Sequence, residues 1–363
     1  MTKKLSALVI VLLMASLAAC GDYETTGKGS DSTPQPALSE LEPLKKPKEI
    51  TGPSTAVLRD RDVEVVESTE KAKLPAKVVS HLRGGDKTVT VTDTSRIVAF
   101  DMAGSIAGTL WGLGLGDNLV ARDISTEFPG SEKLPLITSE GHAVNAEAVM
   151  AQKPTVIITD GSMGPRDVVE QLADTGVPVI FVENDPSFAG AAQLAKDVGQ
   201  AVGLVATGKK LADRIEAEIA EVRTEIERFA PTNESEKLRV VFLYVRGNSG
   251  VYYLFGKEAG VSSLLDGLGA FDVAEELGWR AMQPLTDEAM VKADPDLILV
   301  MTHGLDSAGG VDGLLAEKPA IALTTAGKNK RIVDMADGDI LSFGPRSAMT
   351  LEALARAIYV PQD

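Results

Sequence analysis

The sequence predicts an α/β fold of two lobes joined by a long helix, and three observations support that fold class. Short apolar runs rich in β-branched residues alternate with helical stretches, which is typical of parallel sheets covered on both faces. A proline-free amphipathic span, residues 187–230, separates two such blocks. The 363 residues also exceed the size at which single cores stop growing. We therefore expect an amino-terminal lobe at 93–186 and a carboxyl-terminal lobe at 231–363.

The first twenty residues have the features of a lipoprotein signal. Lys3 and Lys4 precede an apolar run, residues 5–17, which is too short to span a membrane but suits a secretory signal. Small residues then lead into Cys20, the single cysteine of the chain, in a pattern that resembles a bacterial lipobox. We expect removal of residues 1–19, a lipid on Cys20, and attachment to the extracytoplasmic face of the cell membrane.

Residues 20–92 differ from the rest of the chain in composition. Ser, Thr, Pro, Lys and Glu dominate, and Tyr23 is the one aromatic residue among Phe, Trp and Tyr. Such a segment buries too little apolar area to offset its chain entropy. We expect a flexible, disordered tether, with a weak pairing of residues 63–66 with 89–91 and a solvated His81.

The first lobe follows from apolar periodicity. Its expected strands are 97–100, 155–159 and 178–182, and its expected helices are 105–113, 146–152 and 167–175. In the span 187–230, apolar residues recur at helical spacing and charged residues occupy the opposite face. This pattern predicts a long connecting helix, with a separate shorter helix before it as the alternative.

The second lobe repeats the pattern of the first. Its expected strands are 238–245, 251–255 and 297–301, and its expected helices are 261–268 and 347–358. Residues 147–158 and 288–299 align without gaps as a short helix, a proline and a buried strand. This internal similarity supports two lobes of similar Rossmann-like construction.

Composition excludes several classes of function. One cysteine excludes an internal disulfide framework, and three histidines argue against a histidine-rich zinc cage. A formal net charge of −16 argues against nucleic-acid binding, which needs a basic face. No nucleophile–base pair or phosphate-binding loop stands out, so we expect a protein that is not an enzyme.

The motifs together resemble a family of transport proteins. A lipobox, two α/β lobes, a long helix and paired E-A-x-x-x-x-x-P units resemble the class III substrate-binding lipoproteins of vitamin B12, siderophore and haem ABC importers. Residues 309–315, 324–331 and 343–346 resemble the haem-binding, HmuT-like branch of that group. Gly141-His142 and the Tyr244–Gly247 run resemble Gram-positive haemin-uptake lipoproteins that place a His/Tyr pair on haem iron.

This resemblance implies a monomeric carrier that captures ferric haem b between its lobes. It would deliver the haem to an ABC permease with its ATPase, for iron acquisition. Two alternatives remain open: a siderophore- or corrinoid-binding lipoprotein of a related importer, and a surface haem sensor or haem-degrading protein.

The resemblance implies His142 and Tyr244 as axial ligands, and the residues themselves suit that chemistry. A tyrosinate is a hard anionic donor suited to ferric iron. A free phenol has a pKa near 10, so ionisation at neutral pH needs help. Arg246 lies on the same strand face as Tyr244 by the two-residue period, and its guanidinium would hydrogen-bond the phenolate. His142 lies in a loop just before the helix at 146–152.

Other residues are expected to complete the pocket and the docking surface. His303, at the end of the strand 297–301, is a reserve ligand or propionate contact. Arg246, Arg280 and Arg346 could each meet a haem propionate, and Tyr252 and Tyr253 could form its apolar walls. By resemblance, Glu147 and Glu288 would dock one lobe each onto the permease, although the first turn of a helix favours a glutamate in any case.

Overall fold

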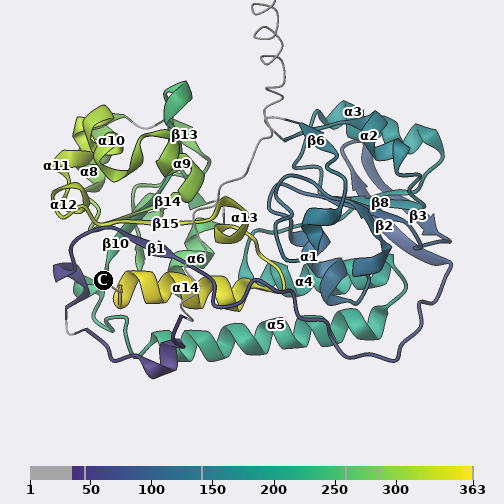
Figure 1. Ribbon diagram of the computed structural model, residues 1–363, viewed down its shortest axis with the longest axis horizontal. Helices are drawn as coiled ribbons and strands as arrows, with labels where there is room; N and C mark the ends of the chain where they lie inside the picture. The colour runs from purple at the N-terminus through teal and green to yellow at the C-terminus, as the bar shows by residue number, and fades with distance from the viewer. Residues whose placement is uncertain (1–34, 45, 140–141, 258–259, 285, 362–363) are drawn as a thin grey trace, which may run out of the picture. The chain divides into compact units, whose positions relative to one another are not determined.

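The computed structural model describes residues 35–361, except 45, 140–141, 258–259 and 285 (Figure 1). The expected signal peptide, residues 1–19, and Cys20 lie outside these described residues. Within them, no helix combines the length and the apolar character needed to cross a membrane.

The amino-terminal lobe is built on a parallel sheet whose strands follow the order β5-β4-β8-β9. Along its strand β4, Ile97 and Ala99 pack into one apolar cluster while Val98 and Phe100 pack into another. The strand is therefore buried on both faces, as its uninterrupted apolar run predicts. The strands are β4 (Ile97–Phe100), β5 (Leu119–Ala121), β8 (Val156–Thr159) and β9 (Val179–Phe181), with a small ribbon of β6 (Thr138–Ser139) and β7 (Ala143–Val144). The helices are α1 (Ser105–Gly112), α2 (Ala146–Ala151) and α3 (Arg166–Gln171), with 3-10 turns at Gly116–Asn118, Ser131–Lys133 and Leu172–Thr175.

The carboxyl-terminal lobe has a mixed seven-stranded sheet in the order β1-β15-β14-β10-β11-β13, with β12 beside β10. Strands β1, β15, β14 and β10 are parallel, β11 runs antiparallel to β10, and β13 runs antiparallel to β11. The strands are β1 (Ser54–Ala56), β10 (Arg239–Arg246), β11 (Val251–Leu254), β12 (Phe271–Asp272), β13 (Gln283–Pro284), β14 (Leu297–Met301) and β15 (Ile332–Met335). The helices are α6 (Val261–Gly267), α7 (Val273–Glu276), α8 (Asp287–Ala293), α9 (Thr302–Ser307), α10 (Gly310–Glu317), α11 (Pro319–Leu323), α12 (Thr325–Lys328), α13 (Asp337–Ile340) and α14 (Ser347–Tyr359), with 3-10 turns at Glu234–Glu236 and Gly247–Ser249.

Two helices, rather than one, connect the lobes. The span 187–230 forms α4 (Phe188–Ala201) and α5 (Val205–Ile226), which confirms the alternative of a separate shorter helix. Gly203, at a φ of 76°, turns the chain between them in the left-handed region that glycine adopts freely. A side chain at Gly199 would meet the backbone of Gly208, so the two helices pack with their backbones in close approach. The long helix α5 lies beside α14 (Figure 1).

The expectation of a disordered tether over 20–92 is wrong for the described part of that segment. Strand β1 pairs with β15 as an edge strand of the second lobe, and Leu38 is 1% exposed. Strands β2 (Ala76–Leu82) and β3 (Gly85–Val91) form an antiparallel hairpin, so the expected pairing of 63–66 with 89–91 is also wrong. Two 3-10 turns, Leu38–Glu40 and Pro47–Glu49, precede β1. Composition misleads here because a segment that covers an existing core needs few apolar residues of its own.

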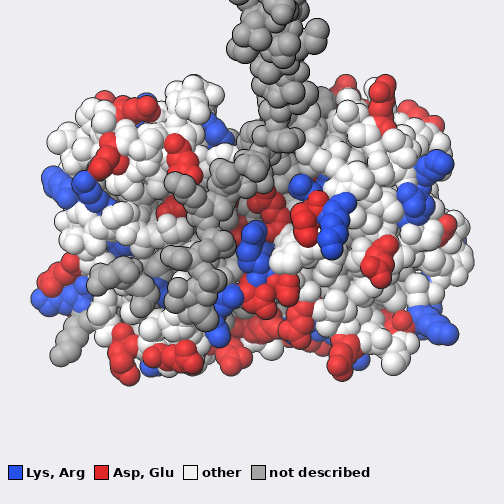
Figure 2. Space-filling view, in the orientation of Figure 1, with Lys and Arg blue, Asp and Glu red and all other residues white. Residues whose placement is uncertain are grey.

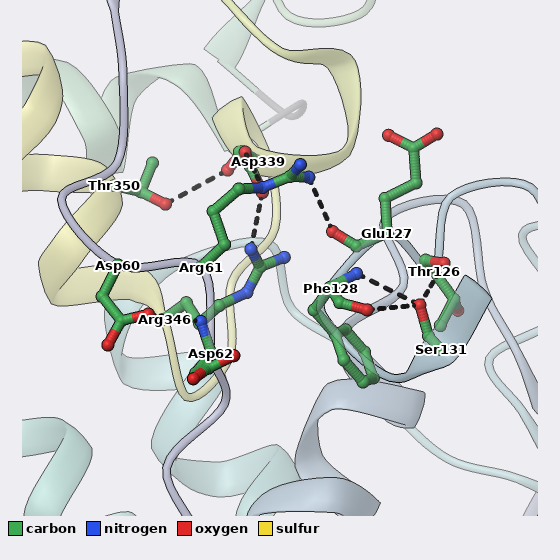
Figure 3. A network of polar contacts seen from close by, with 10 residues as sticks. All are labelled: Asp60, Arg61, Asp62, Thr126, Glu127, Phe128, Ser131, Asp339, Arg346 and Thr350. Carbon is green, nitrogen blue, oxygen red and sulfur yellow. Dashed lines mark hydrogen bonds and ion pairs between the residues drawn. The ribbon is translucent and has the colours of Figure 1, made fainter. Parts of the chain in front are cut away.

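The part of this segment between β1 and β2, residues 57–75, is called the strap below. Figure 3 shows Arg61 of the strap between residues of both lobes. Its Nη2 donates to the backbone oxygen of Glu127 in the first lobe at 2.9 Å. Its Nε lies 3.9 Å from Oδ2 of Asp339 in the second lobe, and the buried Arg346 donates to Oδ1 of the same aspartate at 2.7 Å. The strap therefore contacts both lobes at one junction.

The strap is also fixed to the helices beneath it. The Val66 amide donates to the Gly112 carbonyl of α1 at 2.8 Å. Farther along, Oε2 of Glu70 accepts hydrogen bonds from the Thr207 amide at 2.7 Å and its hydroxyl at 2.8 Å, near the start of α5. A carboxylate at the amino end of a helix satisfies donors that have no partner within the helix.

Candidate functional site

The carboxyl end of β10 carries the tyrosine and the arginine that the sequence analysis singled out. Tyr244 is half-buried, and its ring meets Phe255 edge-on, with the ring centroids 6.0 Å apart. The guanidinium carbon of Arg246 lies 4.5 Å from the centroid of the Tyr244 ring, so both side chains share a face of the sheet as the two-residue period predicts. The antiparallel register places Tyr253 of β11 directly opposite Tyr244, on that same face.

Arg246 is held by two acceptors. Its Nη1 donates to its neighbour's carbonyl, Val245 O, at 2.8 Å, and its Nη2 donates to Oδ2 of Asp337 at 3.3 Å. The guanidinium therefore lies over the ring of Tyr244, and these hydrogen bonds replace the one to the phenol oxygen that the sequence analysis expected. The other oxygen of Asp337, Oδ1, accepts from the His303 amide at 3.1 Å.

His142 faces this cluster from the other lobe. It lies between β6 and β7 with a φ of 62°, a left-handed conformation that few non-glycine residues adopt. Its Nδ1 is buried and has no hydrogen-bond partner among the residues that the structure describes. Burial lowers the pKa of His142, the positive charge of Arg246 lowers it further, and Asp337 opposes them. The imidazole is therefore neutral at neutral pH and lies within electrostatic reach of two residues of the second lobe.

Backbone strain and an unsatisfied buried nitrogen together are features of functional sites rather than of ordinary packing. The site thus joins a neutral imidazole from the first lobe to a tyrosine, an arginine and an aspartate from the second. Such a pair of nitrogen and oxygen donors can bind a transition-metal centre from two sides.

A model of the periplasmic binding protein family matches residues 102–337. The chain belongs to this family. Its two α/β lobes, joined by α4 and α5, have the fold of the class III substrate-binding proteins. The family and its structural neighbours are binding proteins.

Three similar proteins have informative names. The heme-binding protein HmuT has a crystal structure with 37% sequence identity to this chain and a TM-score of 0.79, covering 87% of this chain and 100% of its own. The periplasmic heme-binding protein RhuT from Roseiflexus sp. RS-1 is 34% identical, with a TM-score of 0.67 and coverage of 74% and 98%. The ABC transporter substrate-binding lipoprotein YvrC of Bacillus subtilis (strain 168) is 28% identical over 252 residues, which are 69% of this chain and 76% of YvrC. Further HmuT structures carry alanine in place of a histidine, a tyrosine or an arginine.

Three other residues that the sequence predicted for the pocket are Tyr253, His303 and Arg280. Tyr253 lies beside Tyr244, and His303 is exposed at the start of α9 with its amide on Asp337. Arg280 is exposed in the segment between α7 and β13.

Two expected pocket residues lie elsewhere. Tyr252 is buried on the opposite face of the sheet, where its hydroxyl donates to Glu317, and burial with this contact raises its pKa to about 12. Its assignment to the pocket wall was wrong because neighbouring residues of a strand point to opposite faces. Arg346 is buried at the lobe junction in its ion pair with Asp339 (Figure 3), so its proposed contact with a propionate is wrong as well.

Asp337 is the site residue that sequence reasoning missed. One residue, Ala336, separates it from the end of β15, and it is the first residue of α13. The available signal was an acidic residue after a buried strand, because ligand sites of α/β folds gather at the carboxyl ends of parallel strands.

The two candidate docking glutamates occupy matching positions. Glu147 and Glu288 are each the second residue of a helix, α2 and α8, and both are exposed. The helices begin with similar caps, since the side chain of Asn145 accepts from the Ala148 amide and that of Thr286 caps α8 in the same way. The internal repeat thus places one exposed carboxylate on each lobe.

Buried carboxylates follow two neighbouring strands of the first lobe. Asp101 follows β4 and accepts from the amides of Ser105 and Ile106, at the start of α1. Asp123 follows β5 and accepts from the Asp101 amide at 3.1 Å. Burial raises the pKa of Asp123 to about 6, and burial together with nearby carboxylates raises the pKa of Asp101. Their hydrogen bonds are structural, because they fix the loops that follow β4 and β5.

A cavity of about 500 Å³ lies away from His142 and Tyr244, against the strap. Three of its lining residues are the carboxylates Asp60, Asp62 and Glu64, beside Trp111. Acidic side chains also gather along the lower edge of the face shown in Figure 2, where α5 runs. The carboxylates that line this cavity would repel an anionic ligand. The candidate site is therefore the cluster formed by His142, Tyr244, Arg246 and Asp337.

Proposed function

We propose that this protein binds ferric haem b between its two lobes, with His142 and Tyr244 as axial ligands, and delivers it to an ABC importer. The observation that carries the proposal is the position of His142. Its Nδ1 is buried without a hydrogen-bond partner among the described residues, and the imidazole lies within electrostatic reach of Arg246 and Asp337 of the opposite lobe.

The number of available donors favours haem over a bare metal ion. Among the described residues, no group of three or more His, Cys, Asp and Glu side chains could hold a metal ion. A zinc ion, for example, takes three or four protein ligands. The iron of haem already has four ring nitrogens, so the protein need supply only axial ligands. Two donors from opposite lobes meet that requirement.

Charge at the site favours the ferric state. Ferric iron prefers an anionic oxygen donor, and tyrosine serves as a haem ligand in other proteins. The Arg246 guanidinium carbon lies 4.5 Å from the centroid of the Tyr244 ring, a geometry in which a cation is attracted to the π face of the ring. The neutral imidazole of His142 has a lone pair available for the second axial position.

The comparisons support the same ligand and residues. HmuT and RhuT are both named heme-binding proteins, and the match to HmuT covers 100% of the HmuT chain and 87% of this chain. The substituted tyrosine and arginine of HmuT are two positions apart, the spacing of Tyr244 and Arg246 here.

The delivery step rests on YvrC and on the two exposed glutamates. YvrC is named as a lipoprotein of an ABC transporter, which supports an extracytoplasmic protein anchored through Cys20. Glu147 and Glu288 would each contact one subunit of the permease, whose ATPase drives import.

Haemin titration of the purified mature protein tests the ligand assignment. We expect a Soret band on adding haemin and no uptake of cobalamin supplied in parallel. His142→Ala and Tyr244→Phe should each weaken haem affinity by roughly tenfold or more, because each removes one iron ligand. His81→Ala and Tyr252→Phe are matched controls, since both residues lie outside the site.

The ligand assignment would be wrong if both site variants kept the spectrum and affinity of the unsubstituted protein. Cobalamin uptake without a Soret band would point to the corrinoid alternative. Conversion of the bound haem to oxidation products would instead indicate a degrading enzyme.

A further inference from the structure

We propose that Asp337 is a positioning residue: it fixes the guanidinium of Arg246 over Tyr244 and so strengthens the bond between the tyrosinate and the iron. This inference rests on the proposed function, in which Tyr244 is an iron ligand. Asp337 itself does not touch the iron in this scheme, because it acts through Arg246.

The sheet topology brings the partners together. Strands β15, β14 and β10 are adjacent and parallel, so their carboxyl ends lie at one edge. Asp337 follows β15, His303 follows β14, and Arg246 ends β10. Three segments far apart in sequence therefore meet beside Tyr244.

The carboxylate of Asp337 is oriented from one side. Its Oδ1 accepts from the His303 amide at 3.1 Å, and this amide belongs to the first turn of α9, where helices have donors without partners. With Oδ1 fixed in this way, Oδ2 lies 3.3 Å from Nη2 of Arg246. The backbone thus sets the direction in which Asp337 presents its second oxygen.

Arg246 needs its hydrogen bond to Asp337 to keep one orientation. A guanidinium on a long side chain loses much rotamer freedom when it is fixed, and the Val245 carbonyl alone holds just one of its nitrogens. Without Asp337 the guanidinium could turn toward solvent or toward a haem propionate. With Asp337 it stays over the ring of Tyr244. The geometry therefore commits Arg246 to the tyrosinate rather than to a propionate.

A double-substitution cycle on the haem complex tests this role. Asp337→Ala, Arg246→Ala and the double variant are compared by the phenolate bands in resonance Raman spectra and by the rate of haem transfer to apomyoglobin. We expect Asp337→Ala and Arg246→Ala each to shift the phenolate bands and to speed transfer about tenfold. The double variant should transfer no faster than Arg246→Ala, because one residue acts through the other.

Two further variants make the test specific. Asp337→Asn keeps an oxygen for the His303 amide but loses the charge, so its bands and transfer rate should lie between those of the unsubstituted protein and Asp337→Ala. Asp312→Ala is the matched control: this exposed aspartate also pairs with a cation, Lys330, at 2.7 Å, in the first turn of α10 in the same lobe. It should change neither readout.

Additive effects of the two alanine substitutions, or unchanged phenolate bands in Asp337→Ala, would overturn the positioning role. If Asp337→Ala lowers the thermal unfolding midpoint so far that it cannot be loaded, Asp337→Asn decides by the same criteria. A protein without phenolate bands before any substitution would instead refute Tyr244 ligation, and with it the proposed function.

Discussion

Replacing Arg331 by methionine should detach the amino-terminal segment from the second lobe and lower the free energy of unfolding. Arg331 is 2% exposed, and burial lowers its pKa to about 10, so it is cationic at neutral pH. Its Nη1 donates to Gly52 O at 3.2 Å and to Ser54 Oγ at 3.0 Å. Its Nη2 donates to the carbonyls of Ala357 at 2.9 Å and Ile358 at 2.6 Å, in the last turn of α14.

The magnitude follows from these four contacts. A hydrogen bond to a charged group contributes about 1.5–3 kcal/mol to stability, and acceptors left buried without a partner cost more. Methionine has a similar length and removes the cost of burying a charge, which offsets part of this loss. We expect a net decrease of about 3–5 kcal/mol in the free energy of unfolding.

Urea unfolding measures the total decrease in the free energy of unfolding, and hydrogen exchange shows which segments lose stability. In Arg331→Met, the amides of β1 and of the last turn of α14 should exchange faster than in the unsubstituted protein. Arg59→Met is the control, because Arg59 belongs to the same segment and pairs with Glu352 of α14 at 3.4 Å, but its side chain is 45% exposed. The reasoning is refuted if Arg331→Met costs no more than Arg59→Met, for which we expect below about 1 kcal/mol.

Three further predictions concern pH and docking. Folding raises the pKa of Asp123 to about 6, so its contribution to stability is present at pH 4 and lost as the pH rises through 6, and Asp101 shifts in the same direction. The free energy of unfolding, measured in urea at pH 4.5 and 7.5, should therefore fall less in Asp123→Asn than in the unsubstituted protein; equal decreases would contradict the assignment. Folding lowers the pKa of His142, so the affinity ratio between the unsubstituted protein and His142→Ala should stay constant from pH 8 to 6.5 and decrease below that range; a decrease already between pH 8 and 7 would contradict a neutral ligand. Glu147→Ala combined with Glu288→Ala should impair haem uptake by cells and leave haem affinity unchanged, whereas normal uptake would exclude docking through these residues.

The local periodicity of apolar residues predicted most of the helices and strands. The strand at 97–100 and the strand at 297–301 match β4 and β14 residue for residue, because buried parallel strands are continuous apolar runs. The sequence did not decide whether the helical span 187–230 breaks at Gly203, because a glycine within a helical pattern does not by itself end a helix.

The errors share a cause, which is dependence on partners distant in sequence. Strand β1 is a strand because β15 offers it an edge, and nothing within residues 54–56 indicates this. Tyr252 and Tyr253 are neighbours, and the register of β11 against β10 decides which of them faces Tyr244. Asp337 becomes a site residue through its contact with Arg246, 91 positions away.

The pairing of β1 with β15 has a consequence for biogenesis. Ser54 pairs with Val333, so an early strand of the chain and its last strand lie side by side in one sheet. A chain exported amino end first, as proposed, would carry β1 across the membrane long before β15 emerges. The second lobe can therefore complete its sheet only after nearly all of the chain has crossed, and closing so long a loop slows folding. The pairing of β1 with β15 is therefore expected to be among the last steps in the folding of the second lobe.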